Sequence, residues 1–565
     1  MTLSQALDVA ADRHPDRPLV ITDPQTYSYR DIQGWSAALA AGLIARGVQA
    51  GDHVAVVLAN YPDFVAVRYA ISRVGAVAVP INFALRRQEL SYILEQSDST
   101  VLITMDRLRD RDYLDDLDAL APGWETAGGG ARWPRLRHVI VHSCAESTRP
   151  AATMLAELTR LGTPEDRAEV ARRSAAADPH FRSDVIYTSG TTGLPKGVML
   201  SHDMILRAAY ASAYTRAFED GRRILFSLPM YHVFGFVECL IASTFAGGAI
   251  IPHVAFDAGR MLAAAQAHRA TEMVCVPMMT LKLLEAARAG GFDGSHLVAM
   301  FNSGGASPPS IWQDIRDVLG AREVLTAYGM TETTASTTCT LPEGADRHLL
   351  ETNGCLKQAG VAGDPSLGGV LAQYKTVDPL SGEDQPAGVT GELVARGPII
   401  TQGYYNKPEE TRAALDADGW LHTGDVGVVT SEGYLTLTGR LKETYRCGGE
   451  MVMPREIEDL LNAHPLVGHA HVVGIPDVKM GEVGCVFVLP AGDVWPDPRE
   501  LIDLCAARLA RFKVPRHVVF ITPDELPLTA TGRPQKFRLA ELAQQRLAAP
   551  QPGRRVFTDS TPRKT

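Results

Sequence analysis

The stretch that decides the fold is a loop between two apolar runs, and it reads Tyr187-Thr188-Ser189-Gly190-Thr191-Thr192-Gly193-Leu194-Pro195-Lys196-Gly197. The flanking runs, Val185–Tyr187 and Val198–Leu200, are short and apolar and adjoin this glycine-rich loop, which predicts buried strands. Glycines let backbone N–H groups approach an anion, hydroxyls donate further hydrogen bonds, and a lysine adds positive charge. The loop is therefore predicted to hold a polyphosphate. It lacks the Walker spacing, because Gly197 follows Lys196, and a flexible polar surface loop is the alternative.

Strand and helix patterns alternate on both sides of this loop, which predicts an α/β fold with parallel strands covered by helices. Before the loop, helical spacing is expected at Leu3–Arg13, Ile32–Arg46, Tyr61–Val74 and Arg87–Gln96, and strands at Val54–Leu58, Val77–Ile81 and His138–His142. After it, Ser201 or Asp203 is expected to cap a helix that runs to about Arg216. Further strands are expected at Ile224–Leu228, Ala249–Ile251, Met273–Val276 and Leu297–Asn302.

Two segments depart from this alternation. Residues 107–131 are charged and end in glycines, which predicts an excursion over the surface. Residues 364–440 are rich in glycine and proline with short β-like runs, which predicts a small twisted or barrel-like β region. The expected organisation is a large N-terminal domain of layered sheets with helices (1–441, its β-rich subdomain at about 364–440), a small α+β C-terminal domain (442–545) and a disordered tail (546–565).

Composition narrows the class of protein. The 565 residues carry a formal net charge of −10, which argues against a nucleic-acid-binding surface. The eight cysteines form no C-x-x-C pair, which disfavours structural zinc and a disulfide framework and favours a reducing compartment, so a cytoplasmic location is expected. The first residues lack the pattern of a signal peptide, and no apolar run is long enough for an integral membrane segment.

Four further stretches complete a set that resembles the ANL superfamily of adenylate-forming enzymes, in its acyl-CoA synthetase branch. With the loop, the matching stretches are Tyr328–Thr333 (YGMTET), Trp420–Gly427 (WLHTGDVG), Gly439–Glu458 and Pro527–Lys536 (PLTATGRPQK). They occur in the family's order and span about residues 1–545. The resemblance implies a small C-terminal domain that is mobile relative to the N-terminal one.

The resemblance assigns nucleotide-binding roles to residues in the first 441 positions. Glu332 is the expected Mg²⁺ ligand and catalytic carboxylate, since a cation must bridge it to a triphosphate; a charge at a helix N-terminus is the alternative. Tyr328 is expected to stack on adenine, or else to be a core tyrosine. The remaining expected nucleotide contacts are Thr188 (also catalytic), Ser189, Gly190, Thr191, Thr192, Gly193, Lys196, Gly304, Gly305, Ala306, Gly329 and Thr331.

Later residues complete the predicted site. Asp425 can accept hydrogen bonds from both ribose hydroxyls, with Arg440 as a second contact; a turn residue and a surface ion pair are the alternatives. Lys536 is the expected catalytic ammonium, which would stabilise charge as a carboxylate attacks the α-phosphorus. Lys442 matches the family's hinge. A solvated lysine and an ordinary linker lysine are the respective alternatives.

Substrate-binding predictions are broader. His232 matches the family's aromatic position beside the carboxylate, with a structural histidine as the alternative. Gly448 and Gly449 resemble the loop that closes on the phosphopantetheine arm of CoA. Glu238 is expected to face solvent, or alternatively to select a polar substrate. The acyl pocket is expected from the mostly apolar ranges Tyr231–Ile241, Val274–Leu284, Ser303–Ala306 and Ala327–Ser336.

The resulting prediction is an AMP-forming carboxylate–CoA ligase that uses ATP, Mg²⁺ and CoA. A fatty or aromatic acid would become an acyl-adenylate and then a thioester. The alternatives are transfer to an acyl-carrier protein or a nitrogen nucleophile, a luciferase-like oxygenase, and a non-catalytic nucleotide-binding regulator. Retention of the predicted site residues argues against a regulator. Monomer and homodimer both remain open.

Overall fold

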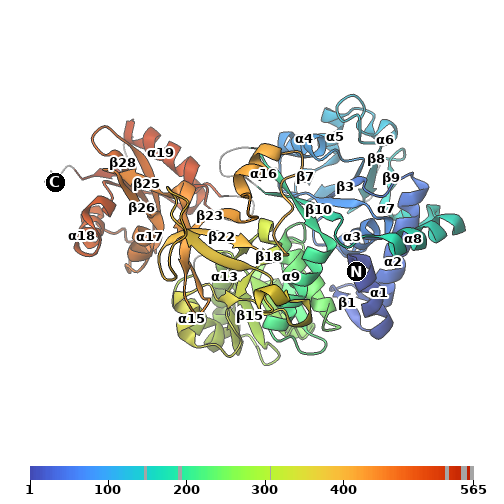
Figure 1. The fold of residues 1–565 in the computed structure, drawn as a ribbon, viewed down its shortest axis with the longest axis horizontal. Coiled ribbons are helices and arrows are strands. Elements are labelled where there is room, and N and C mark those ends of the chain that lie inside the picture. The colour runs from blue at the N-terminus through green and yellow to red at the C-terminus, as the bar shows by residue number, and fades with distance from the viewer. Residues whose placement is uncertain (145–148, 189–193, 306, 529–533, 549–555, 560–565) are drawn as a thin grey trace. The chain divides into compact units, whose positions relative to one another are not determined.

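The computed structural model describes residues 1–144, 149–188, 194–305, 307–528, 534–548 and 556–559 (Figure 1). The chain forms two compact units. The first contains residues Met1–Gln373, Ala395–Leu421 and Glu432–Tyr434, and the second contains Tyr374–Val394, His422–Ser431 and Leu435–Thr565. The residues of the expected β region, 364–440, are thus divided between the two units.

One sheet of the first unit contains the two strands that flank the glycine-rich loop. Its strands are ordered β11 (Lys196–Ser201), β10 (Arg182–Thr188), β4 (Val77–Pro80), β3 (His53–Val57), β5 (Val101–Met105), β8 (His138–His142) and β9 (Thr153–Met154). These neighbours pair in parallel except β10 and β11, which are antiparallel. Strands β3 and β5 are buried throughout, as expected of parallel strands covered on both faces.

The helices of the N-terminal half lie in the same unit as this sheet. They are α1 (Leu3–Arg13), α2 (Tyr29–Ala45), α3 (Pro62–Val74), α4 (Arg87–Gln96), α7 (Leu155–Leu161), α8 (Pro164–Ala176) and α9 (His202–Thr215). Their ends follow local chemistry: the Thr2 hydroxyl caps α1, and α3 ends at Gly75, whose φ is 76°. Ser201 caps α9, which confirms one of the two predicted caps.

A second sheet of the first unit follows the same plan. Its order is β16 (Glu323–Leu325), β15 (Ala299–Asn302), β14 (Glu272–Cys275), β12 (Arg223–Phe226), β13 (Ala249–Pro252), β1 (Pro18–Ile21) and β2 (Thr26–Ser28), parallel except for β1 with β2. Its helical segments are α10 (Val233–Gly235), a π-helix (Phe236–Ile241), α11 (Ala242–Thr244), α12 (Ala258–Ala267), α13 (Pro277–Gly290) and α14 (Ile311–Asp314) with a π-turn (Ile315–Leu319). The predicted alternation of strand and helix is confirmed.

Residues 107–131 differ from the predicted surface excursion. They form β6 (Arg107–Leu108), β7 (Arg111–Asp112), α5 (Leu114–Leu120) and α6 (Trp124–Ala127). Leu117 and Trp124 are each 1% exposed and belong to the main core, and the Trp124 indole donates to Asp118. The prediction was wrong because it relied on the many charged residues, whereas a few apolar side chains among them pack into the core.

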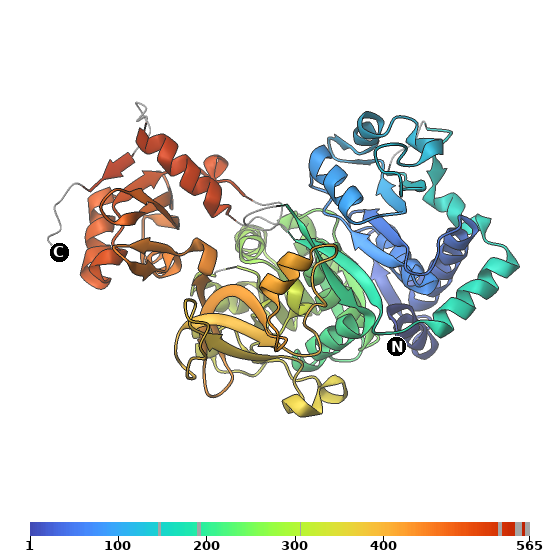
Figure 2. The ribbon, with the colours of Figure 1, turned by 45° about the horizontal axis from the view of Figure 1, so that its top comes forward.

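The β-rich region forms a sheet ordered β21 (Gln373–Val377), β22 (Gly391–Arg396), β23 (Leu421–Val429) and β24 (Leu435–Arg440). Beyond it, the second unit has β25 (Tyr445–Cys447), β26 (Glu450–Val452), α17 (Pro454–Asn462), β27 (Val467–Asp477), β28 (Gly481–Pro490), α18 (Pro498–Arg508), β29 (His517–Phe520), α19 (Lys536–Ala548) and β30 (Val556–Thr558). Helices α17 and α19 pack on β27, the first strand of a long hairpin (Figure 2). Strand β30 pairs with β29, so the prediction of a disordered tail was wrong for these residues.

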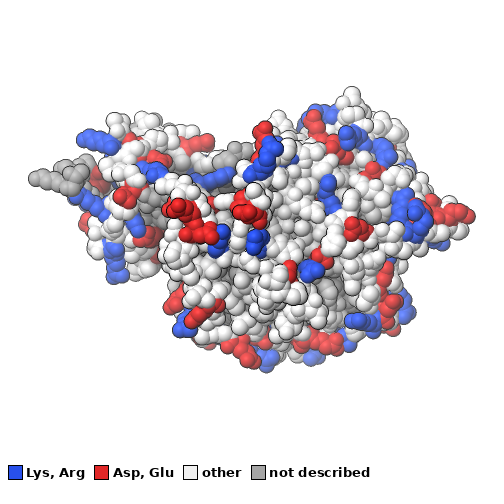
Figure 3. Space-filling model, viewed as in Figure 1, with Lys and Arg blue, Asp and Glu red and all other residues white. Residues whose placement is uncertain are grey.

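Short elements connect these layers. They are β17 (Gly329–Met330), β18 (Ala335–Ser336), β19 (Thr338–Cys339), α15 (Asp346–Glu351), β20 (Cys355–Leu356), α16 (Pro408–Ala414) and single 3₁₀ turns at Thr331–Thr333, Gly360–Ala362, Pro365–Leu367, Leu441–Glu443, Arg511–Lys513 and Pro523–Glu525. Acidic and basic side chains are interspersed over the face that Figure 3 shows. Within the described parts of the chain, no helix combines the length and apolar character that a bilayer crossing requires.

Candidate active site

The β10–β11 hairpin fixes the two ends of the predicted polyphosphate loop. Thr188 lies opposite Lys196 in the antiparallel register, and both are partly exposed. Behind them, Val185 and Val198 are fully buried and anchor the strands. Residues Ser189, Gly190, Thr191, Thr192 and Gly193 lie outside the described residues. The described geometry therefore places Thr188 and Lys196, the first and last predicted nucleotide contacts of the loop, side by side.

Glu332 lies in a tight turn between β17 and β18. A Cβ at Gly329 would lie 2.0 Å from the Ala335 carbonyl oxygen, so this position requires glycine. Thr334 and Ala335 have φ values of 62° and 133°, which costs residues with a side chain about 1–3 kcal/mol each. The Thr334 hydroxyl donates to the Ile399 carbonyl at 2.7 Å and helps hold the turn. Strain at a turn that carries one buried carboxylate is typical of a functional site.

Tyr404 links this turn to the end of the polyphosphate loop. Its hydroxyl donates to Glu332 Oε1 at 2.9 Å, and the Lys196 ammonium lies 4.7 Å from the centre of its ring. Burial, together with the Glu332 carboxylate, raises the pKa of Tyr404, so the phenol stays a neutral donor. The structure thus brings Lys196 and Glu332, which are distant in sequence, to the same side chain.

Sequence reasoning missed Tyr404. It lies in the stretch Gln402-Gly403-Tyr404-Tyr405, which has no charge and no recognisable motif. Its backbone position comes from tertiary pairing: Val198 and Tyr404 form an antiparallel bridge, and the Tyr405 N–H donates to the Gly197 carbonyl at 2.8 Å. Two adjacent tyrosines between a glycine and a proline-led helix were the available signal.

A hydrogen bond joins the two loops that contain the predicted nucleotide contacts Gly304 and Tyr328. The Ser303 hydroxyl donates to the Ala327 carbonyl at 2.7 Å, which ties the loop after β15 to the residue preceding Tyr328. Tyr328 is 6% exposed, and its N–H donates to the Thr338 hydroxyl at 3.1 Å. Gly304 has a φ of 92°, a conformation that favours glycine. Gly305 and Thr331 lie in the same two segments, and Ala306 lies outside the described residues.

His232 has a capping contact. Its Nδ1 accepts a hydrogen bond from the Phe234 N–H at 3.2 Å, at the start of α10. This contact fixes the ring and agrees with the structural alternative named for this residue. Its predicted place beside the substrate carboxylate stays a prediction.

Glu238 contradicts both expectations for it. The side chain is 1% exposed, and Lys357 Nζ lies 3.0 and 3.1 Å from its two oxygens. The Ser336 N–H donates to it at 2.9 Å, and Ser212 also donates to it. Burial raises the pKa of Glu238, but Lys357 and Arg216 outweigh burial, and the pKa falls below its ordinary value. The carboxylate neither faces solvent nor is available to select a substrate.

Asp425 and Arg440 form a pair in the second unit. They face each other in the β23–β24 register, and Arg440 Nε lies 2.9 Å from Asp425 Oδ1. The Asp425 side chain is 4% exposed and that of Arg440 is 40% exposed. The two predicted ribose contacts therefore occur together, with the aspartate held by the arginine.

Two other predictions fall on turns of the second unit. Lys442 is exposed in the 3₁₀ turn Leu441–Glu443 that follows β24. Gly448 and Gly449, with φ values of 64° and 93°, form the two-residue turn between β25 and β26. Positive φ at both central positions suits a tight hairpin and explains the two glycines. Their predicted roles, as hinge and as CoA loop, stay predictions.

Lys536 begins α19 and is held by two carboxylates. Its Nζ lies 2.8 Å from Glu458 Oε1 and 3.0 Å from Glu443 Oε2, and its side chain is 16% exposed. The preceding residues Thr529 to Arg533 lie outside the described part of the chain. The solvated-lysine alternative is therefore wrong for this arrangement of the second unit.

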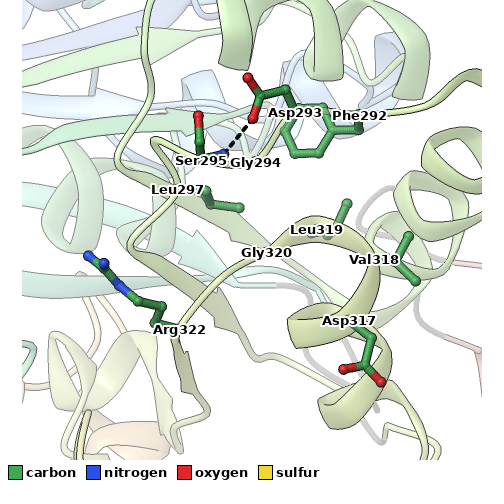
Figure 4. A pocket seen from close by; sticks show the side chains of 10 residues that line it. All are labelled: Phe292, Asp293, Gly294, Ser295, Leu297, Asp317, Val318, Leu319, Gly320 and Arg322. Atoms are coloured by element: carbon green, nitrogen blue, oxygen red, sulfur yellow. Dashed lines mark hydrogen bonds between the residues drawn. The ribbon is translucent and has the colours of Figure 1, made fainter.

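The cavity in Figure 4 is separate from the predicted residues. It measures about 310 Å³ and is lined by Phe292, Asp293, Gly294, Ser295, Leu297, Asp317, Val318, Leu319, Gly320 and Arg322. The Asp293 carboxylate accepts the Ser295 N–H at 2.9 Å and is used in the loop itself. Among the described residues, no group of three or more His, Cys, Asp or Glu side chains forms a metal cage. A single carboxylate such as Glu332 still suits Mg²⁺, which commonly binds one or two carboxylates plus substrate phosphates.

Two family models match the chain. One, described as AMP-binding enzyme, matches residues 7–405, and another, AMP-binding enzyme C-terminal domain, matches residues 456–533. A putative acyl-CoA synthetase YngI of Bacillus subtilis is 33% identical over 546 residues, covering 96% of each chain. A mitochondrial medium-chain acyl-CoA ligase ACSF2 of Danio rerio is 30% identical over 562 residues, covering 97% of this chain and 89% of the relative. The crystal structure of ATP-bound MatB from Rhodopseudomonas palustris matches with a TM-score of 0.81 at 25% identity, covering 96% and 99% of the two chains.

Proposed function

The chain belongs to the AMP-binding enzyme family of the ANL superfamily, and from this premise we propose that it converts a carboxylic acid to its CoA thioester in two steps. First, a carboxylate oxygen attacks the α-phosphorus of ATP, the bond to the leaving oxygen breaks, and pyrophosphate departs. Second, the CoA thiol gives up its proton, its sulfur attacks the acyl carbon, and AMP departs with the electron pair. The adenylate is needed because a free carboxylate is a poor electrophile.

The arrangement of Lys196, Tyr404 and Glu332 carries this proposal. Lys196 adds positive charge at the end of the glycine-rich loop, and a lysine beside backbone N–H groups is a common phosphate cradle. Glu332 supplies the hard oxygen that Mg²⁺ prefers, and Tyr404 holds that carboxylate in place. When bound, the cation would neutralise phosphate charge. Lys196, which can bind phosphate, and Glu332, which can bind a cation, both contact Tyr404, and this arrangement suits a magnesium–triphosphate substrate.

The other predicted residues take supporting roles in the proposal. Tyr328 and the 303–305 segment would enclose the adenine, and Asp425 with Arg440 would bind the ribose. Lys536 would stabilise the charge that develops as the acid attacks phosphorus. Lys442 would absorb torsion between the two half-reactions, and the turn at Gly448 and Gly449 would contact CoA.

The acid is proposed to be a fatty or aromatic carboxylate that carries no charge besides its carboxylate. The rings of Phe234 and Phe301 pack edge to face, with their centres 5.5 Å apart. Phe234 lies in the expected pocket segment Tyr231–Ile241, and Phe301 lies next to the expected segment Ser303–Ala306. Glu238, the charged residue in the Tyr231–Ile241 segment, is already paired with Lys357. The name of the Danio rerio relative, a medium-chain ligase, points to the same class.

The deciding experiment measures exchange of labelled pyrophosphate into ATP with Mg²⁺ and a panel of straight-chain, aromatic and amino-bearing acids. Acid-dependent exchange is expected with apolar acids, and AMP release is expected to become catalytic when CoA is added. Sustained product formation with a carrier protein or hydroxylamine, but none with CoA, would change the acceptor. No exchange with any acid would refute adenylate formation.

The Lys536→Ala variant tests the division of labour. Adenylate formation should fall by about 10²–10³, the usual effect of losing one stabilising group. Thioester formation from supplied acyl-adenylate should stay within about twofold of the wild type. Lys513→Ala is the matched control, because Lys513 pairs with Glu456 in the same unit. Equal loss in both half-reactions would contradict the role given to Lys536.

A further inference from the structure

The ammonium of Lys536 uses its donors on two carboxylates from different segments. Glu458 comes from α17 and Glu443 from the 3₁₀ turn Leu441–Glu443, and both lie within 3.0 Å of Nζ. An ammonium has three donor hydrogens, so two of them are engaged here. One donor hydrogen remains, so Lys536 can give a phosphate more than one hydrogen bond only if it releases at least one carboxylate.

The two carboxylates are held differently. Glu458 Oε1 also accepts the Val472 N–H at 2.7 Å, and α17 packs on β27, so this carboxylate is fixed by the sheet. Its side chain is 13% exposed. Glu443 is 28% exposed, and it follows Lys442 in a single turn between β24 and β25. Glu458 is thus the fixed partner, and Glu443 is the partner that backbone rotation in the turn can withdraw.

The surroundings explain why the lysine stays charged. Burial lowers the pKa of Lys536, but Glu458 and Glu443 more than compensate and raise it above its ordinary value. His471, on the neighbouring strand β27, is neutral, because burial first and Lys536 second lower its pKa to about 4. Asp459, next to Glu458, is 61% exposed and pairs with Arg455. Without the two carboxylates, Lys536 would lose its two ion-pair partners, and burial would lower its pKa.

We propose that Glu458 and Glu443 are positioning residues for Lys536: Glu458 keeps the ammonium charged and aimed, and Glu443 retains it until the nucleotide phosphates replace that contact. This inference rests on the proposed function, in which Lys536 acts in adenylate formation. It adds two residues to which the predicted site assigned no role. The two should have opposite effects, because one supports the ammonium in use and the other competes with the phosphates.

The kinetic test uses Glu458→Gln and Glu443→Gln, with Glu456→Gln as the matched control from the same helix as Glu458. Glu458→Gln should lower kcat for adenylate formation by about tenfold or more, since misplacing a catalytic group by about 1 Å costs up to 10². Glu443→Gln should keep or raise that rate and lower the KM for ATP. All three variants should make thioester from supplied acyl-adenylate at about the wild-type rate. Parallel losses in both half-reactions would overturn the proposal, because a merely structural role predicts them.

A second measurement does not depend on turnover. Lys536 is labelled with an amine-reactive ester at pH 8 in the full-length protein, and its modification is measured by mass spectrometry relative to Lys513. Glu458→Gln and Glu443→Gln should each raise Lys536 labelling by at least about twofold, because removing a carboxylate lowers the pKa of the ammonium and leaves more free amine. Unchanged labelling would overturn the carboxylate contacts. If no acid supports exchange, the proposed function fails while this measurement still decides the inference.

Discussion

Replacing Lys357 by methionine should strongly destabilise the first unit. Lys357 and Glu238 are 3% and 1% exposed, and they lie 119 residues apart in sequence. Methionine keeps most of the side-chain volume but leaves a buried carboxylate without its ammonium. Breaking a buried pair typically costs 3–5 kcal/mol. Because Arg216 at 3.6 Å and the Ser336 N–H remain, we expect the low end, about 3 kcal/mol, or roughly 150-fold in the folding equilibrium.

Urea denaturation followed by tryptophan fluorescence measures this loss through the midpoint and slope of the transition. Lys375→Met is the matched control, because Lys375 and Asp384 pair at 2.6 Å with side chains 30% and 66% exposed, and such pairs contribute about 1 kcal/mol or less. The double variant Lys357→Met with Glu238→Gln should recover much of the loss, since it no longer buries an unpaired charge. A Lys357→Met protein no less stable than the Lys375→Met control would refute the reasoning.

Three shorter predictions concern the site and its pH dependence. Lys442→Pro should slow one half-reaction much more than the other in separate assays; equal slowing would argue against a hinge. Gly329→Ala should cut acid-dependent pyrophosphate exchange by about 10² or more, because its Cβ would meet the Ala335 carbonyl at 2.0 Å and displace the Glu332 turn; near-normal exchange would contradict that geometry. Burial lowers the pKa of His202 to about 4, so between pH 6.5 and 4 the unfolded chain binds one more proton than the folded chain, and stability falls as the pH falls. When the free energy of unfolding is measured over this pH range, the His202→Gln variant should lose about 2 kcal/mol less than the wild type by pH 5. Identical pH profiles would contradict this.

Local patterns predicted the elements of the fold well. The bounds of α1, α4 and β8 follow from the periodicity of their apolar residues, and the structure has them as expected. Strand β23 was missed as a strand, although its TGD motif was recognised, because glycine, histidine and threonine interrupt its apolar pattern. Local signals thus place elements best where one face is uniformly buried.

Long-range pairings were beyond the sequence. Tyr404 reaches Glu332 across 72 residues, and Lys357 reaches Glu238 across 119. Neither pair shares a motif, and a buried ion pair is visible in sequence only as two isolated charges. The carboxylates around Lys536 were missed for the same reason: Glu443 and Glu458 lie within a recognised stretch, yet only folding shows what they contact.

The route of the backbone has a practical consequence for dissecting this protein. The chain passes from one unit to the other after residues 373, 394, 421, 431 and 434. A single cut cannot release both units as autonomous pieces, because strands β22 and β23 each contain residues of both. Limited proteolysis between residues 374 and 434 should therefore leave nicked fragments that co-purify under native conditions and separate only in denaturant.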